Sequence, residues 1–340
     1  MRTDQYFSEK IFLNEQNNNK SPVFVCEINK IKKEGDYVVF NFYGQQYIAQ
    51  RGKKKISIFE NKCLHRNFPL KSNEAGNEKV ICPYHGWFYN FEGELIGIPK
   101  KDCFEKKIKS RVLKKKIPEI CGKLLFASNK KGDLKKQLGK LYSIIEIVSK
   151  NISQSNFYKK INYSTNWKLC IENSLDEYHI VKVHPTNAGY FGFMKYFRYY
   201  KEKKNLVLFS STEKKHDLSL DNFIKNLKNQ KINMDGYKIF FIYPNLLLHI
   251  YLGLFYYTNF LPIRPDKTIN KVEVFSLKQN NLSDDKLKKF INNYFLPSVY
   301  EDKKIVEDQF KFYTQNKIFQ IKENFSIFEK RIKTFRKNIS

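Results

Sequence analysis

The stretch NKCLHRNFPLKSNEAGNEKVICPYHGWFYN, residues 61–90, places two cysteines and two histidines in two short loops. The first loop holds Cys63-x-His65, and after a gap of sixteen residues the second holds Cys82-x-x-His85. Zinc modules usually take two cysteines from one loop and two histidines from another. Here each loop offers one thiol and one imidazole, which favours a binuclear iron–sulfur cluster with both thiolates on one iron and both imidazoles on the other. A single structural zinc ion is the alternative.

The chain around these loops reads as short strands separated by glycine-containing turns, which predicts a small all-β domain over residues 22–128. The strand-like segments are VFVCEI (23–28), DYVVFNF (36–42), YIAQR (47–51), ISIFEN (56–61), KVICPYH (79–85), WFYNFEG (87–93) and LLFAS (124–128). From residue 129 onward helices and strands are mixed, which predicts an α+β domain over 129–340. Its signals are helical at 166–183, strand-like from 204 to 277, and helical again after Ser283 and after Pro297.

The composition argues against nucleic acid as a partner. The chain has 62 basic and 34 acidic residues, a net charge of +28, but only eight of the basic residues are arginine. Arginine forms the forked contacts with phosphates and guanines, whereas lysines scattered along the whole chain indicate a solvated surface. Six cysteines in a chain without an export signal point to metal ligands at Cys63 and Cys82, with the other four expected to be buried.

No membrane association is expected. The segment IFFIYPNLLLHIYLGLFYY, residues 239–257, approaches the length of a membrane span, but Pro244, Asn245 and His249 interrupt it and favour two buried strands. The first residues lack the apolar run of a signal peptide, and Asp4 and Glu9 argue against a transit peptide. We therefore expect a cytoplasmic location.

A second constellation lies in NWKLCIENSLDEYHIVKVHP, residues 166–185. On an α-helix Asp176 and His179 share a face, whereas His179 and His184 are about 140° apart. Both histidines can reach one ion only if the helix loosens between them, and Pro185 biases His184 away from helical geometry. The pattern predicts a metal site at a helix end, with ordinary polar side chains as the alternative.

The two motifs together resemble those of Rieske non-haem iron oxygenases. CLHR and CPYHGW are similar to the loops that hold a Rieske [2Fe–2S] cluster, and NWK…EN…D-x-Y-H…H is similar to the catalytic signature of the large subunits of aromatic-ring dioxygenases and choline-monooxygenase-like enzymes. The resemblance implies an N-terminal segment, residues 1–21, that packs on the catalytic domain, then a Rieske domain. The catalytic domain is expected to have an antiparallel sheet with helices, a helix-grip or START-like arrangement.

The resemblance also implies roles for individual residues. Cys63, His65, Cys82 and His85 would hold the cluster, and His179 and His184 would bind a mononuclear Fe(II). The family's third iron ligand is a carboxylate on a late helix, for which VYEDKKIVEDQF (299–310) offers Asp302, with competitors at Glu301, Glu307 and Asp308. Asp176 is expected to bridge His85 of one chain to His179 of the next, which implies a ring-shaped oligomer.

The implied function is that of a terminal oxygenase component. Electrons would pass from NAD(P)H through a separate reductase or ferredoxin to the cluster. O₂ activated at the iron would hydroxylate or oxidatively demethylate a small organic substrate, which we expect to be aromatic.

Three further expectations follow from the resemblance. Asn173, in the EN pair of the motif, is expected to act with Asp176 in catalysis. The oligomer is expected to be a homotrimer, which in some relatives carries an additional small beta subunit. Asn173 and Asp176 stand one residue closer together than in some ring dioxygenases, which favours the monooxygenase branch. A quaternary-ammonium monooxygenase is the alternative among enzymes, and a Rieske electron carrier or a zinc-stabilised binding module is the alternative outside them.

Overall fold

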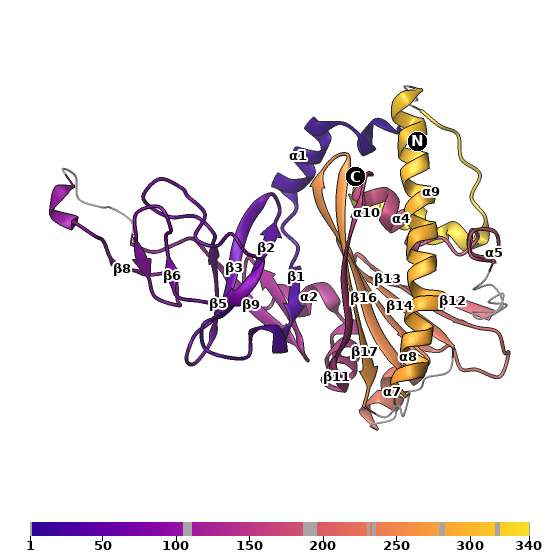
Figure 1. The fold of residues 1–340 in the computed structure, drawn as a ribbon. Coiled ribbons are helices and arrows are strands. Elements are labelled where there is room, and N and C mark those ends of the chain that lie inside the picture. The colour runs from indigo at the N-terminus through magenta and orange to yellow at the C-terminus, as the bar shows by residue number, and fades with distance from the viewer. Residues whose placement is uncertain are drawn as a thin grey trace. The chain divides into compact units, whose positions relative to one another are not determined.

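The computed structural model describes residues 2–104, 111–185, 196–229, 232, 236–278, 283–316 and 320–339. Contacts divide the chain into two compact units. One unit is Asn19–Gln137, and the other combines Met1–Asn18 with Leu138–Ser340. Figure 1 shows the strands of the first unit and the sheet and long helix of the second.

The unit Asn19–Gln137 is built from β-strands, as the sequence predicts. A seven-stranded antiparallel sheet has the order β1-β10-β9-β4-β3-β2-β5, and a smaller sheet has the order β6-β7-β8. The strands are β1 (Val23–Glu27), β2 (Asp36–Phe42), β3 (Gln45–Arg51), β4 (Ile56–Glu60), β5 (Ala75–Asn77), β6 (Val80–Ile81), β7 (Phe88–Tyr89), β8 (Leu95–Gly97), β9 (Lys115–Cys121) and β10 (Leu124–Ser128). Short helical segments are η2 (Ile28–Ile31), η3 (Lys101–Cys103) and α2 (Asp133–Leu138).

The two cysteine-containing loops are anchored to the core of this unit. Cys63, Cys82 and Trp87 belong to one cluster of buried side chains, together with Ile48 and Phe59 of the larger sheet. Burial of these apolar side chains stabilises the loops on which they lie. The loops are therefore held by packing as well as by their own turns.

The second unit is α+β, in agreement with the prediction. Its seven-stranded antiparallel sheet has the order β11-β17-β16-β15-β14-β13-β12. The strands are β11 (Ile152–Tyr163), β12 (Tyr196–Glu202), β13 (Asn205–Ser211), β14 (Tyr237–Ile242), β15 (Leu246–Tyr251), β16 (Leu254–Arg264) and β17 (Lys267–Leu277). The helical segments are η1 (Asp4–Tyr6), α1 (Glu9–Asn18), α3 (Leu141–Lys150), α4 (Trp167–Ser174), α5 (Ile180–Val183), α7 (Leu220–Lys228), α8 (Asp284–Phe290), η4 (Ile291–Phe295), α9 (Leu296–Gln315), η5 (Ile327–Glu329) and α10 (Lys330–Ile339).

One face of this sheet and the long helix α9 enclose the main core. Alternate residues of the strands, such as Leu208, Phe241 and Leu247, point to this face and pack with Val299 and Val306 of α9. The apolar segment 239–257 lies in β14, β15 and β16, so the prediction of buried strands was right, but there are three strands in place of the two expected. In the part of the chain that the structure describes, no helix is long and apolar enough to cross a membrane.

The helices predicted after Ser283 and after Pro297 are both present, as α8 (Asp284–Phe290) and α9 (Leu296–Gln315). The segments α8, η4 and α9 follow one another without a gap, and Pro297 lies in the first turn of α9. Residues Ile291–Phe295 form a π-helical turn. Proline has no N–H to donate, and the first turn of a helix needs none, so Pro297 is compatible with the start of α9.

Candidate metal centres

The two loops of the β unit each bend back sharply around a cysteine. In the first, the Cys63 N–H donates to the Phe68 carbonyl at 2.8 Å, and the Asn67 N–H donates to the Cys63 carbonyl at 3.0 Å. In the second, the Gly86 N–H donates to the Cys82 carbonyl at 2.9 Å. Gly86 has φ +71°, a left-handed conformation that glycine adopts without a steric cost. These turns fix the direction of the cysteine and histidine side chains.

The four loop side chains form two separate pairs. The rings of His65 and His85 lie with their centroids 4.7 Å apart, and the thiol of Cys63 interacts with that of Cys82. No three of these four residues bring their ligand atoms within 4.8 Å of one another, whereas a single zinc ion would draw all four together. Separate pairs of thiols and imidazoles match a cluster with two metal ions, one for each pair.

The surroundings of the thiols also suit a metal cluster. Both thiols are buried and so shielded from solvent. Burial raises the pKa of Cys63, which opposes the free thiolate, so a metal must displace the thiol proton. The Tyr89 hydroxyl lies 3.3 Å from the Cys63 Sγ and accepts a hydrogen bond from the Leu64 N–H at 2.9 Å. The Nδ1 atom of His65 is buried without a hydrogen-bond partner, so it is available as a ligand. The donor set therefore fits a Rieske-type cluster.

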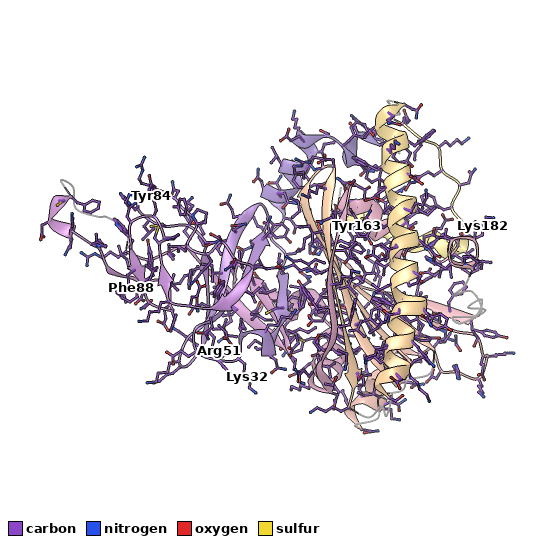
Figure 2. The ribbon with its side chains drawn as sticks, in the orientation of Figure 1. Lys32, Arg51, Tyr84, Phe88, Tyr163 and Lys182 are labelled. Carbon is purple, nitrogen blue, oxygen red and sulfur yellow. The ribbon has the colours of Figure 1, made fainter. Side chains whose placement is uncertain are left out.

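The imidazoles lie at the edge of the cluster site that faces solvent. The His65 ring stacks on buried Trp87, with centroids 4.9 Å apart and planes 4° apart. His85 is exposed and stacks on the exposed ring of Tyr84 at 3.8 Å. Figure 2 shows Tyr84 at the surface of this unit. The side of the site that carries His85 is thus open to a partner molecule.

The second constellation lies where α4 ends, and here the predicted helix breaks earlier than expected. Helix α4 ends at Ser174, and Asp176 lies in the bend that follows. The helical turn α5 then runs between His179 and His184, so the backbone is helical where we expected it to loosen. His184 itself has φ −114° and ψ 61°, outside the helical region, as Pro185 predicts.

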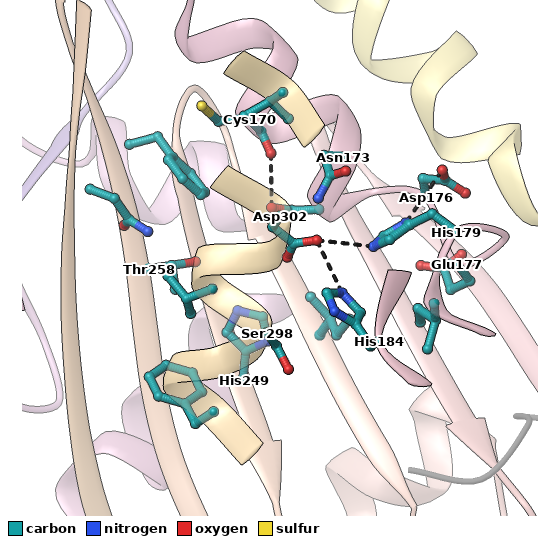
Figure 3. Close-up of a pocket in the computed structure, with 18 of the residues that line it drawn as sticks. Cys170, Asn173, Asp176, Glu177, His179, His184, His249, Thr258, Ser298 and Asp302 are labelled. Atoms are coloured by element: carbon teal, nitrogen blue, oxygen red, sulfur yellow. Dashed lines mark hydrogen bonds and ion pairs between the residues drawn. The ribbon is translucent and has the colours of Figure 1, made fainter. Parts of the chain in front are cut away.

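Three side chains meet at one point between these segments and α9. The Oδ1 atom of Asp302 lies 3.2 Å from the Nε2 of His179 and 3.0 Å from the Nε2 of His184. All three ligand atoms lie within 4.8 Å of one another (Figure 3). The Asp302 Oδ1 is buried and has no partner with hydrogen-bond geometry. Two imidazole nitrogens and a carboxylate oxygen form the set that binds Fe(II) in non-haem oxygenases, so the residues fit that ion.

Carboxylates also lie on the far side of each imidazole. The Nδ1 of His184 lies 2.7 Å from Glu301 Oε2, and the Nδ1 of His179 lies 3.4 Å from Asp176 Oδ2. Such carboxylates fix the ring orientation and leave Nε2 for a metal. Burial opposes the charged form of His179, but Asp176 and Asp302 raise its pKa to about 10. Burial likewise opposes the charged form of Asp302, but the two imidazoles hold its pKa well below the usual range.

The other acidic residues of α9 have different partners. Glu307 accepts hydrogen bonds from the Ser164 N–H and from Lys303, and Asp308 pairs with Lys304 at the surface. Glu301 contacts His184 through Nδ1. Of the four predicted carboxylates, Asp302 is therefore the one that faces both imidazole Nε2 atoms.

Asp176 and Asn173 lie beside the iron-binding set. Both line the cavity next to it, and the Asp176 N–H donates to the Asn173 carbonyl at 3.2 Å. The Asp176 Oδ1 accepts a hydrogen bond from the Tyr178 N–H at 2.6 Å, so the Oδ2 atom faces His179.

The next residue, Glu177, forms an ion pair with buried Arg331 of α10 and accepts a hydrogen bond from the Tyr199 hydroxyl at 2.8 Å. The bend that carries Asp176 is held in place on both sides.

A cavity of about 160 Å³ adjoins the three iron-binding residues. It lies between one face of the sheet and α9, and Figure 3 shows its lining. Apolar and aromatic side chains form most of the wall, and they include Leu208, Ile239, Phe260, Phe295, Val299 and Val306. Its size is below that of most drug-binding pockets, which favours a small substrate.

Sequence reasoning missed two features of this site and was wrong about one cysteine. Glu301 was considered only as a competing ligand, and His249 only as an interruption of an apolar segment, yet His249 lines the cavity. Nothing local in the sequence indicates either contact, because each depends on how a strand or helix packs against another segment. Cys103 is exposed, contrary to the prediction, whereas Cys26, Cys121 and Cys170 are buried.

Family models match both parts of the chain. The model of the Rieske [2Fe-2S] domain matches residues 21–115, and the model of the ring-hydroxylating alpha subunit catalytic domain matches residues 154–340. The carnitine monooxygenase oxygenase subunit of Acinetobacter pittii is 23% identical over 318 residues, which cover 89% of this chain and 82% of that protein.

Other curated relatives are matched over a smaller part of their length. Putrescine 2-hydroxylase of Ralstonia nicotianae is 24% identical, with 53% of this chain and 48% of that protein covered. The large subunit of anthranilate 1,2-dioxygenase of Acinetobacter baylyi is 27% identical, with 48% of this chain and 37% of that protein covered. The matched part of the chain thus spans less than half the length of these two relatives.

Solved structures share the fold. A quaternary ammonium Rieske monooxygenase in complex with an inhibitor has a TM-score of 0.80 at 18% identity, with 100% of this chain and 94% of that chain covered. Naphthalene 1,2-dioxygenase from Rhodococcus sp. bound to indole has a TM-score of 0.77 at 18% identity, with 98% and 93% covered. Identities this low are informative about the fold alone.

Proposed function

The chain belongs to the ring-hydroxylating alpha subunit family, and on this premise we propose that it is the terminal oxygenase component of a multicomponent system. The observation that carries the proposal is the convergence of His179, His184 and Asp302 on one point beside an apolar cavity. An electron carrier would have no use for this second centre. A zinc-stabilised binding module would have no use for the separate thiol and imidazole pairs in the β unit.

The proposed division of labour follows the two centres. Cys63, His65, Cys82 and His85 would hold a [2Fe–2S] cluster, which would supply electron transfer from an NAD(P)H-dependent reductase or ferredoxin that is a separate protein. His179, His184 and Asp302 would hold Fe(II), which would supply the capacity to activate O₂. We assign residues 22–128 to the Rieske domain, residues 129–340 to the catalytic domain, and residues 1–21 to a segment that packs on the latter.

The chain's own residues orient the ligands and shield the substrate. Glu301 and Asp176 hold the two imidazoles by their Nδ1 atoms, and the apolar wall excludes water from the substrate. We propose that Asp176, with Asn173 beside it, links His179 to His85 of a neighbouring subunit in a homotrimer. Such a carboxylate can accept a hydrogen bond from each imidazole and so couple the two centres.

The substrate is a small organic molecule, and an aromatic compound is the first candidate because the cavity wall is apolar. The reaction is hydroxylation or oxidative demethylation. A quaternary ammonium substrate is the second candidate, favoured by the similarity to carnitine monooxygenase over 318 residues. Tyr163, Tyr237 and Tyr256 in the cavity wall could make cation–π contacts with it.

Metal and sulfide analysis of anaerobically purified protein tests the proposal. A [2Fe–2S] cluster and one mononuclear iron predict about three irons and two acid-labile sulfides per chain. Zinc without sulfide would overturn the assignment of the cluster. His179→Ala should retain the visible absorbance of the cluster and lose substrate-dependent O₂ consumption. His216→Ala, outside the cavity, is the matched control, and retained turnover in His179→Ala would exclude the mononuclear site.

A further inference from the structure

Three polar side chains form a hydrogen-bonded row on the sheet face that forms one wall of the cavity. Tyr237 of β14, His249 of β15 and Tyr256 of β16 all line the cavity. The Tyr237 hydroxyl oxygen lies 2.7 Å from the His249 Nδ1 and 2.8 Å from the Tyr256 hydroxyl oxygen. The imidazole also stacks on the Tyr256 ring, with centroids 4.4 Å apart and planes 6° apart. His249 is therefore held in one orientation by a hydrogen bond and by stacking.

The row determines which nitrogen of His249 carries the proton. Burial lowers the pKa of His249 to about 3, so the ring is neutral and has one N–H. If Tyr256 donates to Tyr237 and Tyr237 donates to Nδ1, both hydroxyl hydrogens are used, and the imidazole hydrogen lies on Nε2. The opposite direction leaves the Tyr256 hydrogen without an acceptor in this row. Each direction uses two of the three hydrogens, but a phenol O–H is a stronger donor than an imidazole N–H, and an imidazole nitrogen is a stronger acceptor than a phenol oxygen. Tyr237 therefore donates to Nδ1, and the imidazole hydrogen lies on Nε2.

The Nε2 atom of His249 is buried and has no hydrogen-bond partner among the described residues. Only 7% of the residue is exposed. A buried polar atom without a partner is costly and calls for an explanation. Asp302 Oδ1 and His179 Nδ1 beside the cavity also lack hydrogen bonds, but each has an ion-pair neighbour in the metal centre, His184 Nε2 at 3.0 Å and Asp176 Oδ2 at 3.4 Å. His249 has no place in that centre, and Figure 3 draws it in the cavity wall below Asp302 and His184.

The charges around the cavity define the kind of group that Nε2–H would meet. Its described lining contains the carboxylates Asp176, Glu177 and Asp302 but neither lysine nor arginine. A carboxylate on the substrate would meet no lining cation except the metal. A cationic group would not accept a hydrogen bond from Nε2–H. An uncharged oxygen, such as that of a ketone or an amide, accepts this hydrogen bond without introducing a charge.

We propose that His249 is a specificity-determining residue whose Nε2–H donates a hydrogen bond to an uncharged oxygen acceptor on the substrate. The hydrogen bond holds the oxygen-bearing end of the substrate at the sheet and leaves the apolar end in the rest of the cavity. Tyr237 is a positioning residue that fixes the tautomer of His249. This inference rests on the proposed function, because it assigns the cavity to the substrate.

Binding of matched probes to the full-length, iron-loaded chain tests the inference without turnover. Acetophenone has a carbonyl oxygen where α-methylstyrene, of nearly the same shape, has a methylene group. Equilibrium dialysis under anaerobic conditions should show acetophenone to bind roughly tenfold more tightly, the typical effect of one net hydrogen bond. His249→Phe keeps a planar ring but has no N–H, so the two probes should bind to it with about equal affinity. Its affinity for α-methylstyrene should stay within about twofold of that of the unaltered chain.

Further variants separate a specific role from a general defect. His249→Gln retains an N–H donor near the position of Nε2 and should recover part of the preference for acetophenone. His216→Phe makes the same substitution outside the cavity and should leave the preference unchanged. Iron content and circular dichroism establish that each variant is folded.

The outcomes that would overturn the inference are specific. They are equal binding of the two probes to the unaltered chain, no binding of acetophenone, an undiminished preference in His249→Phe, or tighter binding of benzoate than of acetophenone. The proposed function fails separately. If the chain prefers acetophenone through His249 but consumes no O₂, the inference about binding stands and the proposed oxygenase function is refuted.

Discussion

The contact between Glu301 and His184 leads to a quantitative prediction about metal affinity. The Glu301 Oε2 lies 2.7 Å from the His184 Nδ1, and His184 Nε2 points to the metal position. Removal of a carboxylate that supports a metal-bound histidine typically weakens metal binding by about 10- to 100-fold. The Glu301 side chain is 34% exposed, so solvent screening favours the lower end of that range. For Glu301→Ala we expect a loss of about tenfold, or ~1.4 kcal/mol.

Titration of the metal-free mononuclear site with Co(II) measures this loss, while the visible absorbance of the cluster shows that the other centre is intact. Glu301→Gln keeps an acceptor oxygen but no charge and should have a smaller effect than Glu301→Ala. Asp308→Asn on the same helix removes a surface ion pair with Lys304 and should leave the affinity unchanged. Asp302→Ala removes a ligand and should have the largest effect.

Two results would refute this reasoning. An unchanged affinity in Glu301→Ala would mean that the carboxylate does not support the orientation of His184. A loss as large as that of Asp302→Ala would mean that Glu301 binds the metal itself. The second result would reverse the roles of two adjacent residues of α9, which the sequence alone cannot distinguish.

Three further predictions concern the two centres. The pKa of His179 is raised from 6.5 to about 10, so a metal must displace a proton from this imidazole. The affinity of the site for Co(II) should therefore rise by roughly tenfold per pH unit between about pH 6 and pH 8. An affinity that does not depend on pH would contradict this. The Asp176→Asn variant should retain its iron and sulfide but reoxidise a prereduced cluster more slowly in a single turnover. Stopped-flow absorbance measures this rate, and an unchanged rate would exclude the bridging role. The Tyr89→Phe variant loses a hydroxyl that lies 3.3 Å from the Cys63 Sγ, so the reduction potential of the cluster should fall. Voltammetry measures this potential, and an unchanged value would show that the contact has no effect on the cluster.

Most strands could be predicted because they bury a continuous apolar run or alternate between apolar and polar residues. In the β unit, β5, β8 and β9 escaped prediction, and in the second unit β11 and β12 did so. Much of β11 is exposed, and its sequence ISQSNFYKKINY has many polar residues, so hydrophobic periodicity is weak. Pairing with β17 over most of its length defines β11 as a strand. That pairing joins residues more than a hundred positions apart, and a local pattern cannot reveal it.

The candidate ligands could be identified from the sequence because cysteine, histidine and aspartate have distinctive chemistry at a fixed spacing. The shape of the backbone between Asp176 and His184 could not. We expected a continuous helix that loosens after His179, but the break follows Ser174, and a helical turn separates the two histidines. Two tertiary contacts stabilise this backbone shape. Glu177 forms an ion pair with Arg331, and Asp302 contacts both histidines. These are tertiary interactions that override local helix geometry.

The two centres differ in solvent access in a way that suits different tasks. His85 is exposed and stacks on exposed Tyr84, so its imidazole can approach another protein surface. The Asp302 Oδ1 is buried, and the cavity beside it is mainly apolar. Electron transfer between proteins requires an accessible edge, whereas controlled O₂ chemistry requires the exclusion of water. A polar substitution in the cavity wall, such as Val306→Asn, would admit water there and should uncouple O₂ consumption from product formation without altering the cluster.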